Sequence, residues 1–368
     1  MPKTEKWKID KTFLFLVIGI TLFGLIILTS ASSPLGYDKF GDSYYFIKHQ
    51  LTLGLLPGIA AFLLTISIPY KKWKTVAFPM LLISVGLLIL VFIPGVGADF
   101  GTFANSWVDL GAFSFQPSEI VKLTFLIYLA AWMEKRRDEL KDFHSGLVPF
   151  LIILGIISTL MLLQPDLGTL SIIAAMAFVI YFVAGGPLVY LMGIGASGVA
   201  AFLLAIQTSP YRAARFMTFL HPELDPQGVG YQINQALLAI GSGGFFGRGY
   251  GHSLQKFQYL PEVAGDSIFA IMSEELGFVF TAAFLLVFLF LILRGLKIAE
   301  MSDDNFGKFL VVGIIAWFGV QAFVNIGAML GVMPITGVPL PFMSYGGTSL
   351  VVSLAASGLI LNVSKGVK

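Results

Sequence analysis

The sequence predicts an all-α polytopic membrane protein with about ten transmembrane helices. Of its 368 residues, 57% are hydrophobic and only 12% are charged, and the mean hydropathy is +0.86. A soluble domain is about half apolar and about a quarter charged. Apolar runs of roughly 17–25 residues recur along the chain, and each is long enough to cross a ~30 Å hydrocarbon core. Because irregular backbone cannot face lipid, these runs should be helices.

The first apolar run follows four lysines, as the apolar part of a signal peptide would. It is too long for a cleavable signal and further runs follow it, so we expect a permanent span. Two later pairs of spans are joined by tight turns, at Gln164–Asp166 and Gly185–Pro187. We treat residues 1–368 as one membrane domain. The predicted spans are 13–33, 48–68, 75–95, 117–133, 147–163, 168–184, 187–206, 266–293, 307–332 and 346–364.

Lysine and arginine predict the orientation of these spans. Sixteen of the 23 lie on one side, six on the other, and Lys122 lies within a span. Since cytoplasmic segments carry an excess of Lys and Arg, both termini should be cytoplasmic. The loops 34–47, 96–116, 207–265 and 333–345 should then be extracellular, and 207–265 is a large loop between spans seven and eight. These loops are long and rich in glycine and proline, so we expect the functional face to be the outer one. No internal repeat is visible, which disfavours inverted-repeat transporters.

Common cofactor motifs are missing from the sequence. There is no cysteine, and the four histidines lack metal-ligand spacing. Six glycines lie between 241 and 251, but they do not form a nucleotide-binding loop. They permit positive φ and close approach of the backbone to a ligand. A re-entrant or surface-lying segment would also need such glycines, and both interpretations stay open. Gln235 and Ser242 lie in or near this stretch.

Glu119 and Lys122 are an ionisable pair at the start of a predicted span. Pro117 suits the first position of a helix, and Gln116 or Ser114 could cap the preceding turn. The two charged residues are three apart, so they share a helix face. Charged side chains in a membrane are costly, and a functional role is the default interpretation. The alternative is a pair that snorkels to the interface and only anchors the helix.

Other charged residues lie near the predicted outer surface. Asp166 follows a proline in a tight turn, where capping the next helix is the favoured role. Arg212 and Arg215 are three residues apart in a short predicted helix, and two guanidinium groups on one face suit phosphate or pyrophosphate. Anionic lipid headgroups in general are the alternative ligand for this pair.

Asp266 stands at the start of the eighth predicted span, four residues after Glu262. It is a candidate catalytic carboxylate, although an aspartate at a helix start is often only an N-cap. If the span begins at 266, Glu274 and Glu275 lie ~12–14 Å along the helix. They would then need a wet or paired environment.

Several short motifs along nearly the whole chain resemble the SEDS family (shape, elongation, division and sporulation) of bacterial membrane proteins. They are Phe113-Ser-Phe-Gln-Pro-Ser-Glu119-Ile-Val-Lys122, Leu163-Gln-Pro-Asp-Leu-Gly-Thr169, Tyr211-Arg-Ala-Ala-Arg215, Asp225-Pro-Gln-Gly-Val-Gly-Tyr-Gln232, Ala239-Ile-Gly-Ser-Gly-Gly244, Tyr259-Leu-Pro-Glu262, Asp266-Ser-Ile-Phe269, Glu274-Glu-Leu-Gly277 and Leu340-Pro-Phe-Met-Ser-Tyr-Gly-Gly-Thr-Ser349.

This resemblance implies a peptidoglycan glycosyltransferase of the bacterial cytoplasmic membrane that polymerises lipid II. The segment Lys256–Glu262 is more similar to the FtsW-like branch, although Asn105–Trp107 and Gly265–Phe269 depart from the common patterns. The family implies a class B penicillin-binding protein, a transpeptidase, as partner, and no nucleic acid. It matches Asp266 to the family's essential aspartate. Residues with a binding or supporting role would be Glu119, Lys122, Arg212, Arg215, Gln116, Trp107, Asp166, Gln235, Ser242, Glu262 and Ser344.

The chemistry implied is attack of a sugar 4-hydroxyl on an anomeric carbon with loss of a lipid pyrophosphate. A positioned carboxylate should take the hydroxyl proton, and we expect Asp266 to be that base. Arg212, Arg215, Lys122 or a bound Mg²⁺ or Mn²⁺ would neutralise the leaving pyrophosphate. Two other functions are compatible with the sequence: a lipid II flippase or transporter, and a non-catalytic scaffold of a cell-wall complex.

Overall fold

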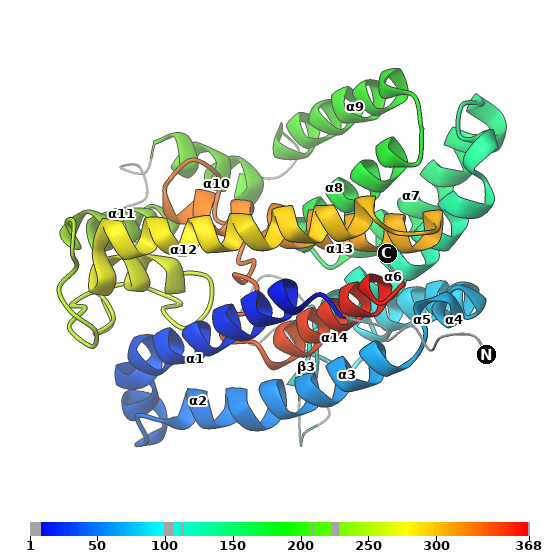
Figure 1. The fold of residues 1–368 in the computed structure, drawn as a ribbon. Coiled ribbons are helices and arrows are strands. Elements are labelled where there is room, and N and C mark those ends of the chain that lie inside the picture. The colour runs from blue at the N-terminus through cyan, green and yellow to red at the C-terminus, as the bar shows by residue number, and fades with distance from the viewer. Residues whose placement is uncertain are drawn as a thin grey trace, which may run out of the picture.

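The computed structural model describes residues 9–98, 106–109, 111, 114–207, 210–221 and 228–366. This part of the chain is a bundle of long helices (Figure 1). The α-helices are α1 (Lys11–Phe40), α2 (Tyr45–His49), α3 (Leu56–Ser67), α4 (Tyr70–Thr75), α5 (Ala77–Leu90), α6 (Pro117–Lys135), α7 (Val148–Leu163), α8 (Leu167–Val183), α9 (Leu188–Gln207), α10 (Pro210–Leu220), α11 (Val229–Ser242), α12 (Ile268–Glu300), α13 (Asn305–Met329) and α14 (Gly347–Ser364).

Six helical segments in the described ranges are long and apolar enough to cross a membrane. They include α1, α12, α13 and α14, together with Tyr45–Ser67 and Phe143–Leu163, in which π-helical turns continue into α3 and α7. Ala77–Leu90, Leu167–Val183 and Leu188–Ala200 are apolar but shorter. A polytopic helical membrane protein, as predicted, is thereby confirmed.

Aspartates begin several of these helices. Asp10, Asp166 and Asp304 each stand at the N-cap of a helix, and each side chain accepts a hydrogen bond from a backbone N–H three residues on. Such caps satisfy donors that have no partner inside the helix. The predicted capping role of Asp166 is therefore confirmed: its Oδ1 lies 3.0 Å from the backbone nitrogen of Thr169.

Helices α13 and α14 form the centre of the bundle, with 72% and 83% of their most apolar stretches buried. Small residues let neighbouring helices approach them closely. A Cβ on Gly313 of α13 would overlap the side chains of Leu126 from α6 and Ile180 from α8, and one on Gly358 of α14 would overlap α3. Helix α13 thus lies where residues from α6, α8 and α12 can meet.

The predicted basic segments gather at one end of the bundle. Arg294 at the end of α12 pairs with Asp10 before α1, with 2.6 Å between Nη2 and Oδ2. Lys71 of α4 pairs with Asp304 at 3.2 Å. The side-chain amide of Asn362 donates to three backbone carbonyls at the end of α3. Two of the loops predicted to be extracellular, 207–265 and 333–345, contact each other, because Oγ of Ser344 donates to Gly265 O.

The all-α prediction needs one correction, because the loop before α6 contains a small antiparallel sheet. Its strands are β1 (Gly97–Ala98), β2 (Trp107–Asp109) and β3 (Ser114–Phe115), in the order β1-β2-β3. Val108 is opposite Gly97 on one side and Phe115 on the other, and its side chain is buried.

The predicted eighth span, 266–293, is interrupted. Gly277 has φ 76° and ψ −179°, so α12 consists of two helical parts, 268–276 and 278–300. The break frees backbone groups that bond the glycine-rich loop: the N–H of Phe278 donates to Gly244 O (2.9 Å), and the N–H of Gly249 donates to Glu275 O (2.9 Å). Glu274 and Glu275 therefore end a short helix rather than lying deep in a continuous span.

The glycines of this loop allow it to lie directly on α12. A Cβ on Gly243 or Gly247 would overlap backbone atoms of residues 273–276, and Gly247 has φ 79°. The sequence left open a ligand-binding role and a re-entrant role for the glycines. In the structure these two glycines provide close contact between backbone segments.

Gly277→Ala should destabilise the protein by at least about 1–3 kcal/mol, because alanine is strained at this positive φ. Its Cβ would also overlap the backbone of Gly247. Thermal unfolding of the purified full chain in detergent measures the loss as a lower Tm. The control is Gly155→Ala in α7, where a Cβ meets nothing within 4 Å and Tm should stay the same or rise. Equal Tm values for the two variants would contradict the strain assigned to Gly277.

Candidate functional site

Asp266 is a buried carboxylate at the end of the large loop, with 9% of its surface exposed. Its Oδ1 accepts a hydrogen bond from Nε2 of Gln232 on α11 (3.4 Å), and the same amide donates to Ser267 Oγ at 3.1 Å. Ser267, not Asp266, stands at the N-cap of α12. The interpretation of Asp266 as a plain helix cap is therefore wrong.

The backbone around Asp266 is held by α13 and by the loop before α14. Nδ2 of Asn325 donates to Asp266 O (2.9 Å) and to Val338 O (2.8 Å). Oγ of Ser344 donates to Gly265 O (2.7 Å) and accepts from the N–H of Leu340 (2.8 Å). Ser344 was predicted as a supporting residue, and the structure brings it next to Asp266. Asn325 and Gln232 were missed, although an amide inside an apolar span was a signal for Asn325.

The surroundings of Asp266 favour its protonated form. Burial, and next the negative charge of Glu262, raise the pKa of Asp266 to about 7, although the hydrogen bonds from Ser267 and Gln232 act in the opposite direction. Glu262 is exposed and has φ 51°. A carboxyl group with a pKa near 7 is populated in both protonation states at neutral pH, which suits a proton-transfer role.

Glu119 and Lys122 form an ion pair inside the bundle. Lys122 Nζ lies 2.7 Å from Glu119 Oε1, and the two side chains are 0% and 2% exposed. Lys122 also donates to Gln321 Oε1 (2.7 Å) and lies 4.8 Å from the ring centre of Trp317. A snorkelling anchor would reach the membrane surface, so the alternative of an interfacial anchor is wrong.

Gln321 connects this ion pair with the loop that holds Asp266. Its Oε1 accepts from Lys122 and from Trp317 Nε1 (2.6 Å), and its Nε2 donates to Pro339 O (2.7 Å). Gln321 lies one turn before Asn325 on α13. The two amides therefore bond consecutive carbonyls, those of Pro339 and Val338. These hydrogen bonds, together with the peptide bond between Val338 and Pro339, connect Lys122 with the backbone of Asp266.

The starts of α6 and α8 meet close to this ion pair. Ser118 Oγ donates to Asp166 Oδ2 (3.3 Å). The N–H of Gln116 donates to Thr348 Oγ1 of α14 (3.4 Å). Gln116 occupies the N-cap position of α6, where its side chain makes no cap hydrogen bond, and Ser114 lies in β3.

The remaining predicted residues differ in what they contact. Gln235 lies three residues after Gln232 on α11, and its buried Oε1 has no hydrogen-bond partner among the described residues. Ser242 bonds Ala239 O within its own helix, which indicates a structural role. Trp107 is partly buried in β2. Arg212 and Arg215 lie on the short helix α10, as predicted, but their side chains fall outside the described residues.

Glu274 and Glu275 have the paired environment that the sequence required. Glu275 Oε1 accepts from Lys256 Nζ (2.9 Å) and from Ser30 Oγ of α1 (2.6 Å), in a site where Lys256 is only 4% exposed. Glu274 pairs with Arg248 (3.5 Å) and accepts from the N–H of Leu254 (3.0 Å). The two carboxylates fix the loop 248–256 to α12 and α1, which is a structural role.

No group of three or more His, Asp or Glu side chains that could hold a metal ion occurs in the described ranges. The residues there do not fit a protein-only Mg²⁺ or Mn²⁺ cage. Mg²⁺ commonly binds through one or two carboxylates with water and substrate phosphates. Asp266 and the nearby Glu262 are the carboxylates that the described part offers for that arrangement.

Comparisons with known proteins cover nearly the whole chain. The profile of the FtsW, RodA and SpoVE family, described as cell cycle proteins, matches residues 10–368. A probable peptidoglycan glycosyltransferase FtsW from Trichlorobacter lovleyi is 39% identical over 98% of this chain and 94% of that protein. Stage V sporulation protein E from Bacillus subtilis is 40% identical over 98% of both chains.

Solved structures share the fold. A chain from a peptidoglycan synthase complex that coordinates polymerization and crosslinking aligns with a TM-score of 0.80 and 28% identity over 97% of both chains. The rod shape determining protein RodA of Thermus thermophilus aligns with a TM-score of 0.72 and 29% identity over 99% of this chain and 98% of that one. With six candidate spans in its described ranges, the chain is a multi-pass protein of the bacterial cytoplasmic membrane. Its sequence and fold together show that it belongs to the FtsW, RodA and SpoVE family of cell cycle proteins, the SEDS proteins.

Proposed function

We infer that the chain is a peptidoglycan glycosyltransferase, which polymerises lipid II into glycan strands at the outer face of the cytoplasmic membrane. The relatives named as probable peptidoglycan glycosyltransferases match along almost the whole chain. The observation in the molecule itself that carries the proposal is Asp266. It is a buried carboxylate with a pKa near 7. Asn325 donates a hydrogen bond to its backbone carbonyl, and Ser344 donates one to the carbonyl of the preceding residue, Gly265.

In the proposed reaction Asp266 is the general base. A sugar 4-hydroxyl transfers its proton to the carboxylate while its oxygen bonds the anomeric carbon of a second sugar. The bond from that carbon to the lipid pyrophosphate breaks, and the pyrophosphate leaves with the bonding electrons. One carboxylate is enough, because pyrophosphate leaves without being protonated, unlike the leaving group of a typical glycosidase.

The leaving pyrophosphate needs positive charge close to it. Lys122 is committed to Glu119, Gln321 and Trp317, so we assign it to supporting the loop around Asp266 instead. Arg212 and Arg215 of α10 remain the proposed pyrophosphate ligands. A divalent cation such as Mg²⁺ or Mn²⁺, carried with the pyrophosphate, would supply the same neutralisation.

We propose that this single domain crosses the membrane ten times with both termini in the cytoplasm. The three shorter apolar helices and α6 supply the crossings beyond the six long ones. The gathering of Lys71 and Arg294 at one end of the bundle agrees with a cytoplasmic face there.

The FtsW-like branch is supported by relatives of 39% and 40% identity named FtsW and stage V sporulation protein E, against 29% for RodA of T. thermophilus. A partner that crosslinks the new strands, a class B penicillin-binding protein, is proposed by analogy with the synthase complex whose fold this chain shares.

Asp266→Asn should abolish polymerisation, lowering the rate by about 10²–10⁴-fold, because the amide cannot accept the hydroxyl proton. The measurement is glycan synthesis from lipid II by the purified full chain with its transpeptidase, and an unchanged Tm shows that the variant folds. The matched control is Asp303→Asn, which changes an exposed aspartate between α12 and α13 and should keep most of the activity. Near-normal synthesis by Asp266→Asn would remove Asp266 from the mechanism. Absence of synthesis by the unaltered chain would favour a lipid II flippase.

The rate of polymerisation should rise with pH through about 7 and then level off. Asp266 acts as a base only when ionised, and its pKa is raised to about 7, so activity falls below that pH by about tenfold per unit. Glu262→Gln removes a negative charge that raises the pKa of Asp266. The pH at which the polymerisation rate declines should therefore be lower in this variant. A rate that stays flat from pH 5 to 8 would argue against Asp266 as the base.

Glu119→Ala should destabilise the protein by about 3–5 kcal/mol, because it leaves Lys122 charged and unpaired in the interior. It should also lower the polymerisation rate, since Lys122 supports the loop of Asp266 through Gln321. The control is Asp42→Ala, which breaks an ion pair of the same 2.7 Å length whose side chains are 66% and 37% exposed. That change should leave Tm nearly unchanged, because ion pairs on the protein surface contribute little to stability. Equal Tm losses in the two variants, with unchanged activity, would reduce the Glu119–Lys122 pair to a passive contact.

A further inference from the structure

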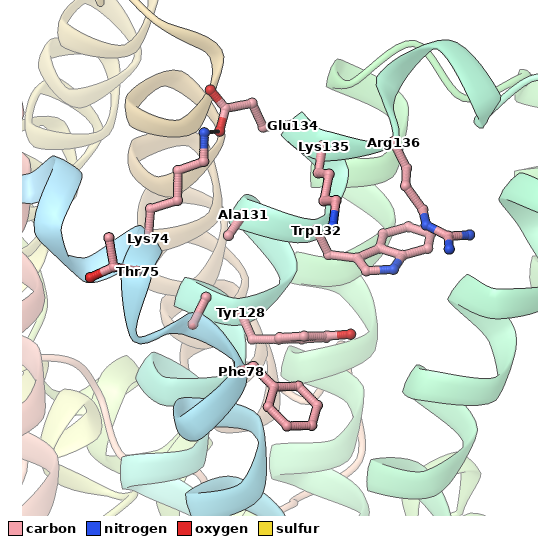
Figure 2. Close-up of a pocket in the computed structure, with 10 residues that line it drawn as sticks. Lys74, Thr75, Phe78, Tyr128, Ala131, Trp132, Glu134, Lys135 and Arg136 are labelled. Carbon is pink, nitrogen blue, oxygen red and sulfur yellow. Dashed lines mark ion pairs between the residues drawn. The ribbon is translucent and has the colours of Figure 1, made fainter.

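A pocket with a volume of about 820 Å³ opens between α5 and α6, and none of the predicted site residues lines it (Figure 2). It lies at the basic end of the bundle, where α4 leads into α5 and where α6 ends. Its volume falls within the ~300–1,000 Å³ typical of small-molecule sites. The lining residues are Lys74, Thr75, Ala77, Phe78, Tyr128, Ala131, Trp132, Glu134, Lys135 and Arg136.

The pocket has an aromatic part and a charged rim. Figure 2 shows the rings of Phe78 and Tyr128 below the ring of Trp132. The charged end of Lys135 lies above Trp132, that of Arg136 lies beside it, and that of Lys74 turns toward Glu134. The Phe78 side chain is exposed, with 62% of its surface accessible. A ligand that fills the pocket would therefore meet apolar rings at one end and cations at the other.

The rim keeps a positive charge after its internal pairs are counted. Lys74 pairs with Glu134, at 2.5 Å between Nζ and Oε2. Arg136 donates to Ser145 O (3.1 Å), faces Glu139 (3.4 Å) and lies over the ring of Trp132. In the part of the chain that the structure describes, no ion pair or hydrogen bond engages the exposed side chain of Lys135. The rim thus offers one free ammonium group beside a guanidinium that the Trp132 ring orients.

The pocket sits at a boundary between polar and apolar surface. On one side α4 exposes Lys71 and Lys72. On the other side α5 continues from Phe78 with the exposed apolar side chains of Leu82 (57%) and Ile83 (45%). A soluble anion would use only the rim, whereas a molecule with a charged head and an apolar tail would use both parts and the face of α5 beyond them.

We propose that this pocket binds an anionic phospholipid of the cytoplasmic leaflet. Its phosphate contacts Lys135 and Arg136, and an acyl chain lies over Phe78 and along the exposed face of α5. Basic residues at this surface attract anionic lipids, and aromatic rings such as Tyr128 and Trp132 favour the headgroup region. The site is separate from Asp266, so its test does not depend on the catalytic role proposed for that residue.

Native mass spectrometry of the full chain in detergent tests this site. Dioleoyl phosphatidylglycerol should remain bound several-fold more than dioleoyl phosphatidylcholine. Lys135→Gln should lower phosphatidylglycerol binding by about fivefold, the effect of one basic residue near an anionic lipid. Lys135→Arg should restore it, because the charge is kept. Lys72→Gln is the matched control: it removes one exposed charge from the same end of the bundle but does not line the pocket, and binding should not change.

Three outcomes would overturn the proposal. Equal retention of the two lipids would exclude a site for anionic headgroups. An equal loss in Lys72→Gln and Lys135→Gln would indicate general attraction by a basic surface. Displacement of phosphatidylglycerol by millimolar inorganic phosphate would indicate a site for soluble anions, in which the aromatic part has no role.

Discussion

Two side-chain amides on α13 hold the irregular backbone on which the candidate site is built. Gln321 and Asn325, one helical turn apart, donate to the carbonyls of Pro339 and Val338, and Asn325 also donates to Asp266 O. Backbone polar groups buried in a membrane protein must be bonded inside the protein, because lipid offers no partners. These amides meet that requirement for two separate loops and fix the position of Asp266.

The ion pair of Glu119 and Lys122 supports the bonding of this buried backbone through Gln321. Burying two charges costs free energy, which their mutual attraction often does not fully offset. Here Lys122 also orients Gln321, because the amide oxygen accepts from Lys122 and from Trp317, leaving the amide nitrogen to bond Pro339. The pair thereby contributes to the geometry around Asp266. Asp266 itself sits where burial and Glu262 hold its pKa far above that of an ordinary aspartate.

Local patterns were enough to predict part of this arrangement. The apolar runs predicted the main helices, and the position of Asp166 after a proline predicted its role as a helix cap. The spacing of Glu119 and Lys122 predicted that they share one helix face. The break at Gly277 could not be predicted, because it depends on backbone contacts with the loop around Gly244. The contact between Gln232 and Asp266 likewise depends on how α11 packs against the start of α12, and no local pattern encodes it.

The central claim is that the fold holds Asp266 as a buried carboxyl group that ionises near neutral pH. Infrared difference spectra of the full chain against Asp266→Asn, recorded as pH is raised, would follow the carboxyl C=O band of Asp266 directly. The band should disappear with a midpoint near pH 7. A midpoint near the ordinary aspartate value of about 3.9 would contradict the claim.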